Sequence, residues 1–304
     1  MTHGFVQSGQ IAAIRASLGY PASSGKSVVV SLLPSRHTKS VHDPMGMSSQ
    51  RIDTPYDVEA RYSQKRSMTW IGYKVHLTET CDTGLPHLIT DVTTTVATVP
   101  DVLETAPIEA ALVARGIPPA QHLVDSGYVS AEELAKSQQR HAIDLVGPIR
   151  ADGTWQAHVD AGYALANFEI RWEQKQAVCP RGKVSRQWKP THTPRGKPTI
   201  HIEFDAADCT PCPVRAQCTR AKRAPRELTI RQQAEFGAME HQRQRQRTDI
   251  FQEVSAQRAG IEGTLSQGVR RTDARHARYQ GTAKVHLQQV MTALALNLVR
   301  LDNW

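Results

Sequence analysis

Three acidic residues in widely separated stretches of the chain are the ones best suited to chemistry. Asp57 lies in P-Y-D-V-E-A-R-Y, Asp125 in H-L-V-D-S-G-Y and Glu262 in R-A-G-I-E-G-T. If a fold gathers such carboxylates, they can hold two Mg²⁺ ions roughly 4 Å apart, and these ions bind the attacking and leaving oxygens of a phosphodiester. The three residues therefore predict a metal-dependent site that acts on a nucleic-acid backbone.

Longer motifs surround these residues from about residue 50 to the C-terminus. They are W-I-G-Y-K-V-H-L-T-E-T-C-D, H-L-V-D-S-G-Y, I-D-L-V-G-P, R-A-G-I-E-G-T-L-S-Q-G-V-R-R and a C-x2-C-P-x-R-x-x-C block. Together they closely resemble the catalytic region of bacterial insertion-sequence transposases of the DDE type. The resemblance implies an α/β fold with an RNase H-like mixed sheet flanked by helices, in which Asp57, Asp125 and Glu262 bind Mg²⁺ or Mn²⁺.

The activity that this resemblance implies is DNA cleavage followed by strand transfer at insertion-sequence ends. The same carboxylates would also serve a nuclease that performs no strand transfer. A third hypothesis is a truncated, non-catalytic DNA-binding remnant, because relatives usually carry a long N-terminal DNA-binding domain and only about 50 residues precede Asp57. Asp53 is a weaker candidate than Asp57 for the first carboxylate.

Hydrophobic patterning predicts alternating strands and helices in the first half of the chain. Apolar residues alternate with polar ones from Ile71 to Leu77, which is typical of a half-buried strand, and Asp82–Gly84 supplies a turn. Ser130 and Glu133 form a capping box that opens a helix. The expected strands are 71–77, 86–99, 122–125 and 143–149, and a further helix is expected at 107–115.

Composition divides the chain into four parts. We expect a poorly ordered segment at 1–50, the first part of the catalytic domain at 51–150, a small β-rich, cysteine-containing insertion at 151–228, and C-terminal helices that complete the catalytic domain at 229–304.

Glu262 is expected on a helix whose apolar stripe faces the body of the protein. At about 100° per residue, this stripe comprises Ile250, Val254, Ile261 and Leu265, with Arg258 inside it and Glu262 at its edge. Arg258 and Glu262 are four residues apart and can pair. A final amphipathic helix is indicated by Leu287, Val290, Met291, Leu294, Leu298 and Leu301.

Basic residues give the chain a formal net charge of +8, which suits a polyanionic partner such as double-stranded DNA. Seen alone, these residues could equally be solvated helix faces. Beside the acidic motifs, phosphate contacts become the better interpretation. The candidate DNA-binding residues are Arg258, Arg270, Arg271, Arg275, Arg278 and Lys284, with a second basic group at Arg243, Arg245 and Arg247.

Four of the five cysteines lie in the expected insertion: Cys179, Cys209, Cys212 and Cys218. Cys209 and Cys212 have the C-x2-C spacing of a structural Zn²⁺ site, and a tetrahedral thiolate site would stabilise a small domain with few large apolar residues. Free or buried thiols are the alternative. Cys81 is expected in the core.

No apolar run approaches the length of a membrane span, and no signal-peptide pattern begins the chain. We therefore expect no membrane contact, a cytoplasmic and nucleoid-associated location in a bacterium, and a homodimer on DNA as a candidate assembly.

Overall fold

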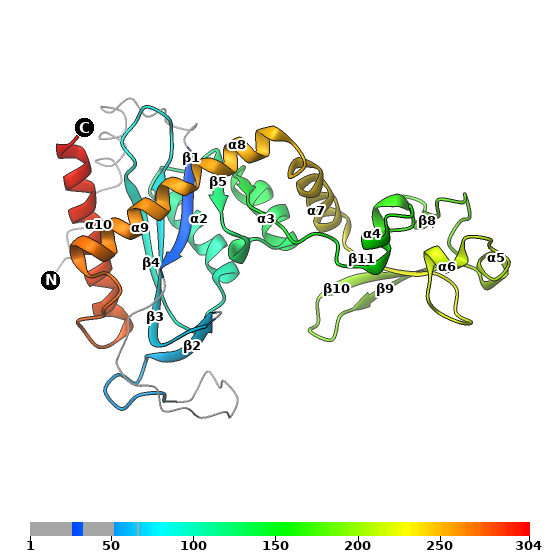
Figure 1. The fold of residues 1–304 in the computed structure, drawn as a ribbon, viewed down its shortest axis with the longest axis horizontal. Helices are drawn as coiled ribbons and strands as arrows, with labels where there is room; N and C mark the ends of the chain where they lie inside the picture. The colour runs from blue at the N-terminus through cyan, green and yellow to red at the C-terminus, as the bar shows by residue number, and fades with distance from the viewer. Residues whose placement is uncertain (1–25, 33–51, 66) are drawn as a thin grey trace. The chain divides into compact units, whose positions relative to one another are not determined.

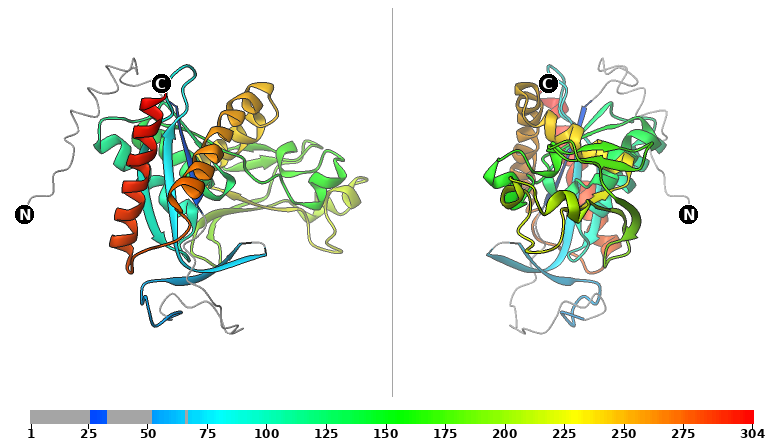
Figure 2. Two further views of the ribbon diagram at one scale, coloured as in Figure 1. Left: turned by 60° about the vertical axis from the view of Figure 1, so that its left-hand side comes forward. Right: turned by 90° about the vertical axis from the view of Figure 1, so that its right-hand side faces the viewer.

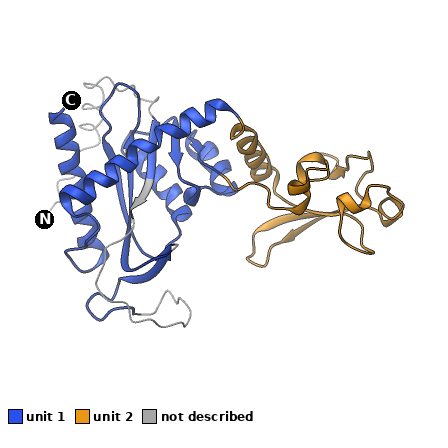
Figure 3. Cartoon of the chain, viewed as in Figure 1, with its two compact units in different colours: residues 1–148, 248–304 blue, residues 149–247 orange. Residues whose placement is uncertain are grey.

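The computed structural model describes residues 26–32, 52–65 and 67–304. The chain divides into two compact units, which Figure 3 colours separately. Unit 1 comprises residues 1–148 and 248–304, and unit 2 comprises residues 149–247. Residues 229–247 therefore fall with the insertion, whereas the sequence analysis grouped them with the C-terminal helices.

Unit 1 is built on a mixed, six-stranded sheet. Strand β1 pairs antiparallel with β3 and parallel with β5, and β5 pairs parallel with β6. Strands β2 and β4 both pair antiparallel with β3. The strands are β1 (Lys26–Leu32), β2 (Arg61–Lys65), β3 (Met68–Thr80), β4 (Ile89–Val96), β5 (Gln121–Val124) and β6 (Asp144–Val146).

Strand β1 corrects the expectation that residues 1–50 are poorly ordered. Residues 1–25 and 33–51 lie outside the described residues, but Lys26–Leu32 is a strand between β3 and β5. Val28 and Val29 are fully buried, one on each face of the sheet. A strand covered on both faces has a continuous apolar run rather than an alternating one, so the period-two test could not find it.

Helices cover both faces of this sheet (Figure 1). Val29 and Val124 pack with α2 and α3 on one face, and Val28 and Leu77 pack with α8, α9 and α10 on the other. Figure 2 shows α10 running alongside the strands. The helices are α2 (Thr105–Ala114), α3 (Ala131–His141), α8 (Asp249–Gln257), α9 (Ala259–Thr272) and α10 (Thr282–Asp302), with two short helices, η1 (Asp101–Glu104) and η2 (Ser126–Tyr128).

This arrangement is a mixed α/β fold of the RNase H-like kind expected from the sequence. The hairpin, the strand before Asp125 and the helix that Ser130 caps are confirmed, with the Glu133 backbone N–H donating to Ser130 Oγ at 3.1 Å. In the described part of the chain, none of the helices has the length and apolar character of a membrane span.

The last helix buries a different face from its most apolar one. Val285, Gln289, Ala293 and Leu296 of α10 are buried against the sheet and α9. The stripe noted in the sequence stays exposed in the described structure: Leu287, Val290, Met291, Leu294, Leu298 and Leu301. Helical spacing identified the helix, but it could not tell which face the sheet covers.

Unit 2 is a small β-rich unit with its own core. Strands β9, β10 and β11 form an antiparallel sheet and β7 pairs with β8. Alternating Ile200 and Ile202 of β10 pack with Phe168 and Phe204. Its elements are α4 (Trp155–Val159), η3 (Leu165–Asn167), β7 (Glu169–Arg171), β8 (Gln176–Val178), β9 (Gln187–His192), β10 (Pro198–Glu203), α5 (Ala206–Cys209), α6 (Arg215–Cys218), β11 (Glu227–Arg231) and α7 (Gln233–Arg245).

Candidate active site

Asp125 lies at the carboxyl end of β5 and caps the short helix η2. One carboxylate oxygen, Oδ1, accepts from the Ser126 backbone N–H at 2.8 Å and from Arg258 Nη1 at 2.7 Å. Burial alone would raise the pKa of Asp125, but the Ser126 N–H and the Arg258 guanidinium outweigh it and hold the pKa below its usual value. The side chain is 46% exposed, so an ionised carboxylate is accessible at this strand end.

Arg258 stands at a junction between two helices rather than within one. Helix α8 ends at Gln257 and α9 begins at Ala259. Ile261 is fully buried and Val254 packs against the core, as the predicted stripe requires, but Ile250 is 70% exposed, and its neighbour Phe251 is the buried residue in this turn of α8. Arg258 pairs with Asp125, the residue directly after β5; the pairing with Glu262 expected from helical spacing is replaced by this tertiary contact.

Glu262 is an exposed residue in the first turn of α9. It follows Arg258 by four residues, about one helical turn. The ion pair between Arg258 and Asp125 therefore ties the beginning of the helix that carries Glu262 to the end of β5. Of the three predicted carboxylates, Asp125 and Glu262 are linked in this way through Arg258.

Asp57 is in a different setting, at the corner where the chain enters β2. Its residue is only 4% exposed. Oδ2 accepts from the Tyr73 hydroxyl at 2.7 Å and from the Gly281 N–H at 3.1 Å, and Oδ1 accepts from the Glu59 N–H at 3.1 Å. Burial would raise the pKa of Asp57, but these hydrogen bonds, that of Tyr73 first, hold it below its usual value.

The register of the sheet separates this corner from the end of β5. Thr78 of β3, Val29 of β1 and Val124 of β5 lie in one row. Tyr73 precedes Thr78 by five residues, and Asp125 follows Val124 by one. Because β3 runs antiparallel to β5, both offsets point in the same direction along the sheet. At about 3.3 Å per residue, the backbone at Tyr73 lies about 13 Å farther along the sheet than Asp125.

No preformed metal centre is present in the part of the chain that the structure describes. No group of three or more His, Cys, Asp or Glu side chains there stands where it could hold one ion. Asp57, Asp125 and Glu262 are all described residues, so they do not make such a group. Their predicted roles as metal ligands stay predictions.

Three residues that the sequence analysis did not single out fix α9 to the sheet. Glu79 of β3 accepts from Thr264 Oγ1 of α9 at 2.5 Å and from Arg300 Nη1 of α10 at 3.0 Å. Glu79 is 1% exposed. The sequence pattern could have identified Glu79. It lies two residues after Leu77 and four after Val75, so it is on the same buried face of β3, and a buried carboxylate needs a partner.

The candidate DNA-binding residues beyond Glu262 are exposed, as expected. Arg270 and Arg271 lie in the last turn of α9, Arg275 and Arg278 in the loop that follows, and Lys284 in α10. Cations in the last turn of a helix also interact favourably with its dipole. In the second basic group, Arg243 forms an ion pair with Glu240 of α7.

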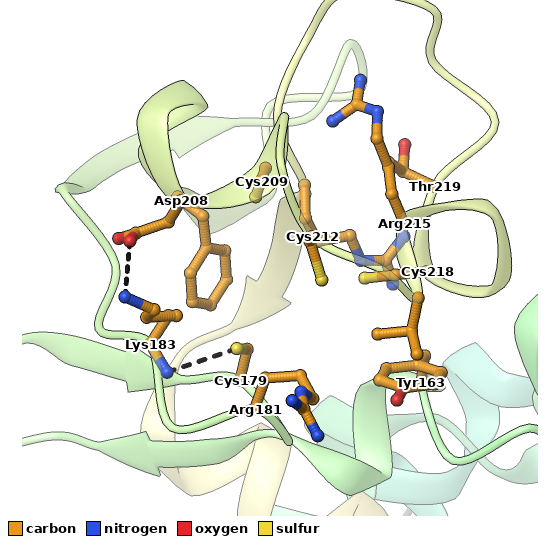
Figure 4. Close-up of a pocket in the computed structure, with 13 residues that line it drawn as sticks. Tyr163, Cys179, Arg181, Lys183, Asp208, Cys209, Cys212, Arg215, Cys218 and Thr219 are labelled. Atoms are coloured by element: carbon orange, nitrogen blue, oxygen red, sulfur yellow. Dashed lines mark hydrogen bonds and ion pairs between the residues drawn. The ribbon is translucent and has the colours of Figure 1, made fainter.

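The four cysteines of unit 2 line one small pocket, shown in Figure 4. They come from three separate pieces of chain: Cys179 after β8, Cys209 and Cys212 at and after the end of α5, and Cys218 at the end of α6. Burial raises the pKa of the Cys218 thiol, an effect that the charge of Arg226 opposes. Cys81 is buried in the core of unit 1, as predicted.

Comparison with known proteins supports one family. Residues 178–302 match a family described as a transposase DDE domain. The matched stretch contains the four cysteines, Glu262 and the exposed basic residues, whereas Asp57 and Asp125 precede it. No curated protein and no solved structure matched the chain. Over this stretch the chain is similar to DDE transposases, which supports a transposase function with DNA as the substrate.

Proposed function

We propose that the chain is a DNA transposase that cleaves a phosphodiester at the ends of an insertion sequence and joins the released 3′-hydroxyl to target DNA. One observation carries the proposal. The Arg258–Asp125 ion pair joins the family-matched helix, with Glu262 in its first turn, to a carboxylate at the carboxyl end of a parallel strand. In open α/β sheets, ligands bind outside the carboxyl ends of such strands.

Two of the three carboxylates fit a divalent metal. Asp125 is ionised and half exposed, and Glu262 is exposed, so both offer hard oxygen ligands of the kind that Mg²⁺ and Mn²⁺ prefer. A bound metal supplies a Lewis acid for the phosphodiester oxygens and a water of lowered pKa. Both oxygens of Asp57 already accept hydrogen bonds within the fold, so we assign Asp57 a structural role instead.

The chain's own residues perform the remaining work in this proposal. The Ser126 N–H and then Arg258 hold the pKa of Asp125 below its usual value, and Arg258 fixes the orientation of the carboxylate through the 2.7 Å contact. The exposed arginines after Glu262 bind phosphates on the duplex and position the scissile strand. Glu79, through Thr264 and Arg300, fixes the angle of α9. The Zn²⁺ expected from the sequence is a structural ion of unit 2 here and takes no part in cleavage.

DNA binding is tested first. A variant with Arg270, Arg271, Arg275 and Arg278 replaced by Gln should bind duplex of any sequence more weakly. Its log-log dependence on salt should flatten by roughly 0.9 per lost phosphate contact. Arg140→Gln, an exposed change on α3 across the sheet, is the matched control. An unchanged salt slope in the fourfold variant would mean that DNA binds elsewhere, with the Arg243, Arg245 and Arg247 group as the next candidate.

The reaction is tested with DNA that flanks the reading frame on each side. With Mg²⁺ or Mn²⁺, the transposase should produce a nick with a free 3′-hydroxyl and then a joined product with a second DNA. Nicks without joined product would identify a nuclease. Binding without any nick would identify a non-catalytic DNA-binding protein and overturn the proposal. A homodimer on DNA stays a prediction, to be measured by light scattering on the same complexes.

A further inference from the structure

The pocket in unit 2 brings four cysteines around one space of about 40 Å³. Figure 4 shows the sulfur atoms of Cys179, Cys209, Cys212 and Cys218 bordering this space. The four cysteines lie within 39 positions of one another in the chain, but they belong to different local turns. This pocket lies outside the residues assigned to DNA cleavage.

The turn that carries Cys179 presents its sulfur to a backbone donor. Gly182 N–H donates to the Cys179 carbonyl at 2.8 Å, and Lys183 N–H donates to Cys179 Sγ at 3.4 Å. Gly182 has a φ of +76°, which allows this tight turn without strain. A backbone N–H directed at sulfur stabilises a thiolate more than a thiol, because hydrogen bonds to an ionised acceptor are stronger.

Positive charge exceeds negative charge around the pocket: Arg181, Lys183, Arg215 and Arg226 line it with one carboxylate, Asp208, which pairs with Lys183 at 2.8 Å. Arg226 Nε and Arg215 Nη1 are buried, and neither has a hydrogen-bond partner among the described residues. Both arginines line the pocket together with the cysteines. Buried guanidinium N–H groups are costly unless paired. Four neutral thiols leave them unpaired, whereas a tetrathiolate metal centre with a net charge of −2 would pair with both.

The segment around the cysteines has little else to hold it together. Neither α5 nor α6 contains a buried residue. Cys179, Cys209 and Cys218 pack at the edge of the core formed by Phe204 and its neighbours. Segments this small usually need a metal or a disulfide for stability.

We propose that Cys179, Cys209, Cys212 and Cys218 bind one Zn²⁺ as thiolates, with Arg215 and Arg226 balancing the charge of the centre. Binding releases the four thiol protons to solvent and changes no oxidation state. The sulfurs do not already stand in the geometry of a metal site. Binding therefore requires the thiols to change rotamer and close around the ion, at about 2.3 Å from sulfur to zinc.

The first experiment measures metal in the full chain purified under reducing conditions. We expect about one zinc per chain by mass spectrometry. After chelation, Co²⁺ should restore the intense visible absorption of a tetrahedral thiolate centre. Absence of zinc together with absence of the Co²⁺ spectrum would overturn the proposal, as would thiol titration that finds these cysteines in disulfides.

Variants then locate the ion. Cys212→Ser should lower the zinc affinity at least about 100-fold and reduce the metal content, whereas Cys81→Ala, a buried cysteine of unit 1, should keep one zinc per chain. If Cys212→Ser does not fold, proteolysis of the wild-type chain tests the site instead. Chelation should make residues 205–226 sensitive to protease, and added Zn²⁺ should protect them. Protease sensitivity that ignores zinc would contradict a site in this segment.

The charge argument has its own test. Arg226→Gln should weaken zinc binding about 10-fold or more, as loss of a group that supports metal ligands typically does. Arg223→Gln removes an equal charge from an exposed position three residues away and should leave the affinity unchanged. Equal affinities in both variants would exclude Arg226 as a charge-balancing residue.

Discussion

Asp57 and Asp125 are the same residue type in the same unit, but they differ in burial and in the number of hydrogen bonds that they accept. Asp57 is 4% exposed and accepts three hydrogen bonds from groups within the unit. The Asp125 side chain is 46% exposed and is held by one guanidinium and one N–H through a single oxygen. The first carboxylate stabilises the fold, and the second keeps an oxygen available for a ligand.

The neighbours of Asp57 explain why both of its carboxylate oxygens accept hydrogen bonds within the fold. Gly281 has a φ of +85° and directly precedes α10, and its N–H donates to Asp57. Tyr73 is 1% exposed on β3. Burial first, and then Asp57, raise the pKa of the Tyr73 hydroxyl, so this hydroxyl stays a donor. Asp57 therefore connects three parts of the unit: strand β3 through Tyr73, the start of α10 through Gly281, and the segment that leads into β2.

The largest expected effect is on catalysis. Asp125→Asn should lower metal-dependent strand cleavage more than 100-fold, because loss of a ligand should exceed the 10–100-fold cost of losing a supporting group. The folded state should persist, as checked by circular dichroism. Asp57→Asn is the comparison. If Asp57→Asn abolishes cleavage and leaves the unfolding midpoint unchanged, Asp57 is a metal ligand, and the proposed difference in role between Asp57 and Asp125 is wrong.

The next effect is on stability. Asp57→Ala leaves the Tyr73 hydroxyl and two backbone N–H groups without their acceptor, and should lower the free energy of unfolding by about 2 kcal/mol. Asp125→Ala should change it by less than about 1 kcal/mol, since its ion pair is substantially exposed. Urea unfolding of unit 1 measures both. Equal losses of unfolding free energy in the two variants would mean that Asp57 contributes no more to stability than Asp125 does.

Acid should narrow the stability difference between wild type and Asp57→Asn. The pKa of Asp57 is lower in the folded state than its ordinary value of 3.8. Its charge therefore contributes stability fully above that ordinary value, and this contribution is lost as the pH falls through the folded pKa. Unfolding midpoints of the two proteins should converge from neutral pH toward pH 2. A constant difference over this range would mean that the Asp57 charge contributes nothing.

The smallest effect concerns Arg258. Arg258→Lys keeps the charge beside Asp125 but loses the planar guanidinium, so stability should fall by less than about 0.5 kcal/mol. The useful measurement is the metal concentration at half-maximal cleavage, which should rise as Asp125 becomes less firmly oriented. Arg140→Gln is again the control. An unchanged metal dependence would mean that Arg258 does not position Asp125.

Local patterns in the sequence predicted several elements, whereas features that depend on tertiary contact were missed. The period of two identified β3, and a capping residue identified α3. Strand β1 was missed because its apolar residues are consecutive. Strand β3 is also covered on both faces, not half buried as predicted, but its polar Lys74, His76 and Thr78 alternate with apolar residues and produced the period of two. The partner of Arg258 could not be found from helical spacing, since Asp125 lies 133 residues earlier. The bonds of Asp57 to Tyr73 and Gly281 likewise exist only once the sheet and α10 are in place.

The way unit 2 interrupts unit 1 has a consequence for biosynthesis. Unit 2 is a continuous stretch whose strand pairs are local in the chain, so it can fold as soon as residues 149–247 leave the ribosome. Unit 1 must wait for residues 248–304, because α8, α9 and α10 cover one face of its sheet. Until then that apolar face is exposed on the nascent chain. We expect it to be the part of the protein that most needs a chaperone.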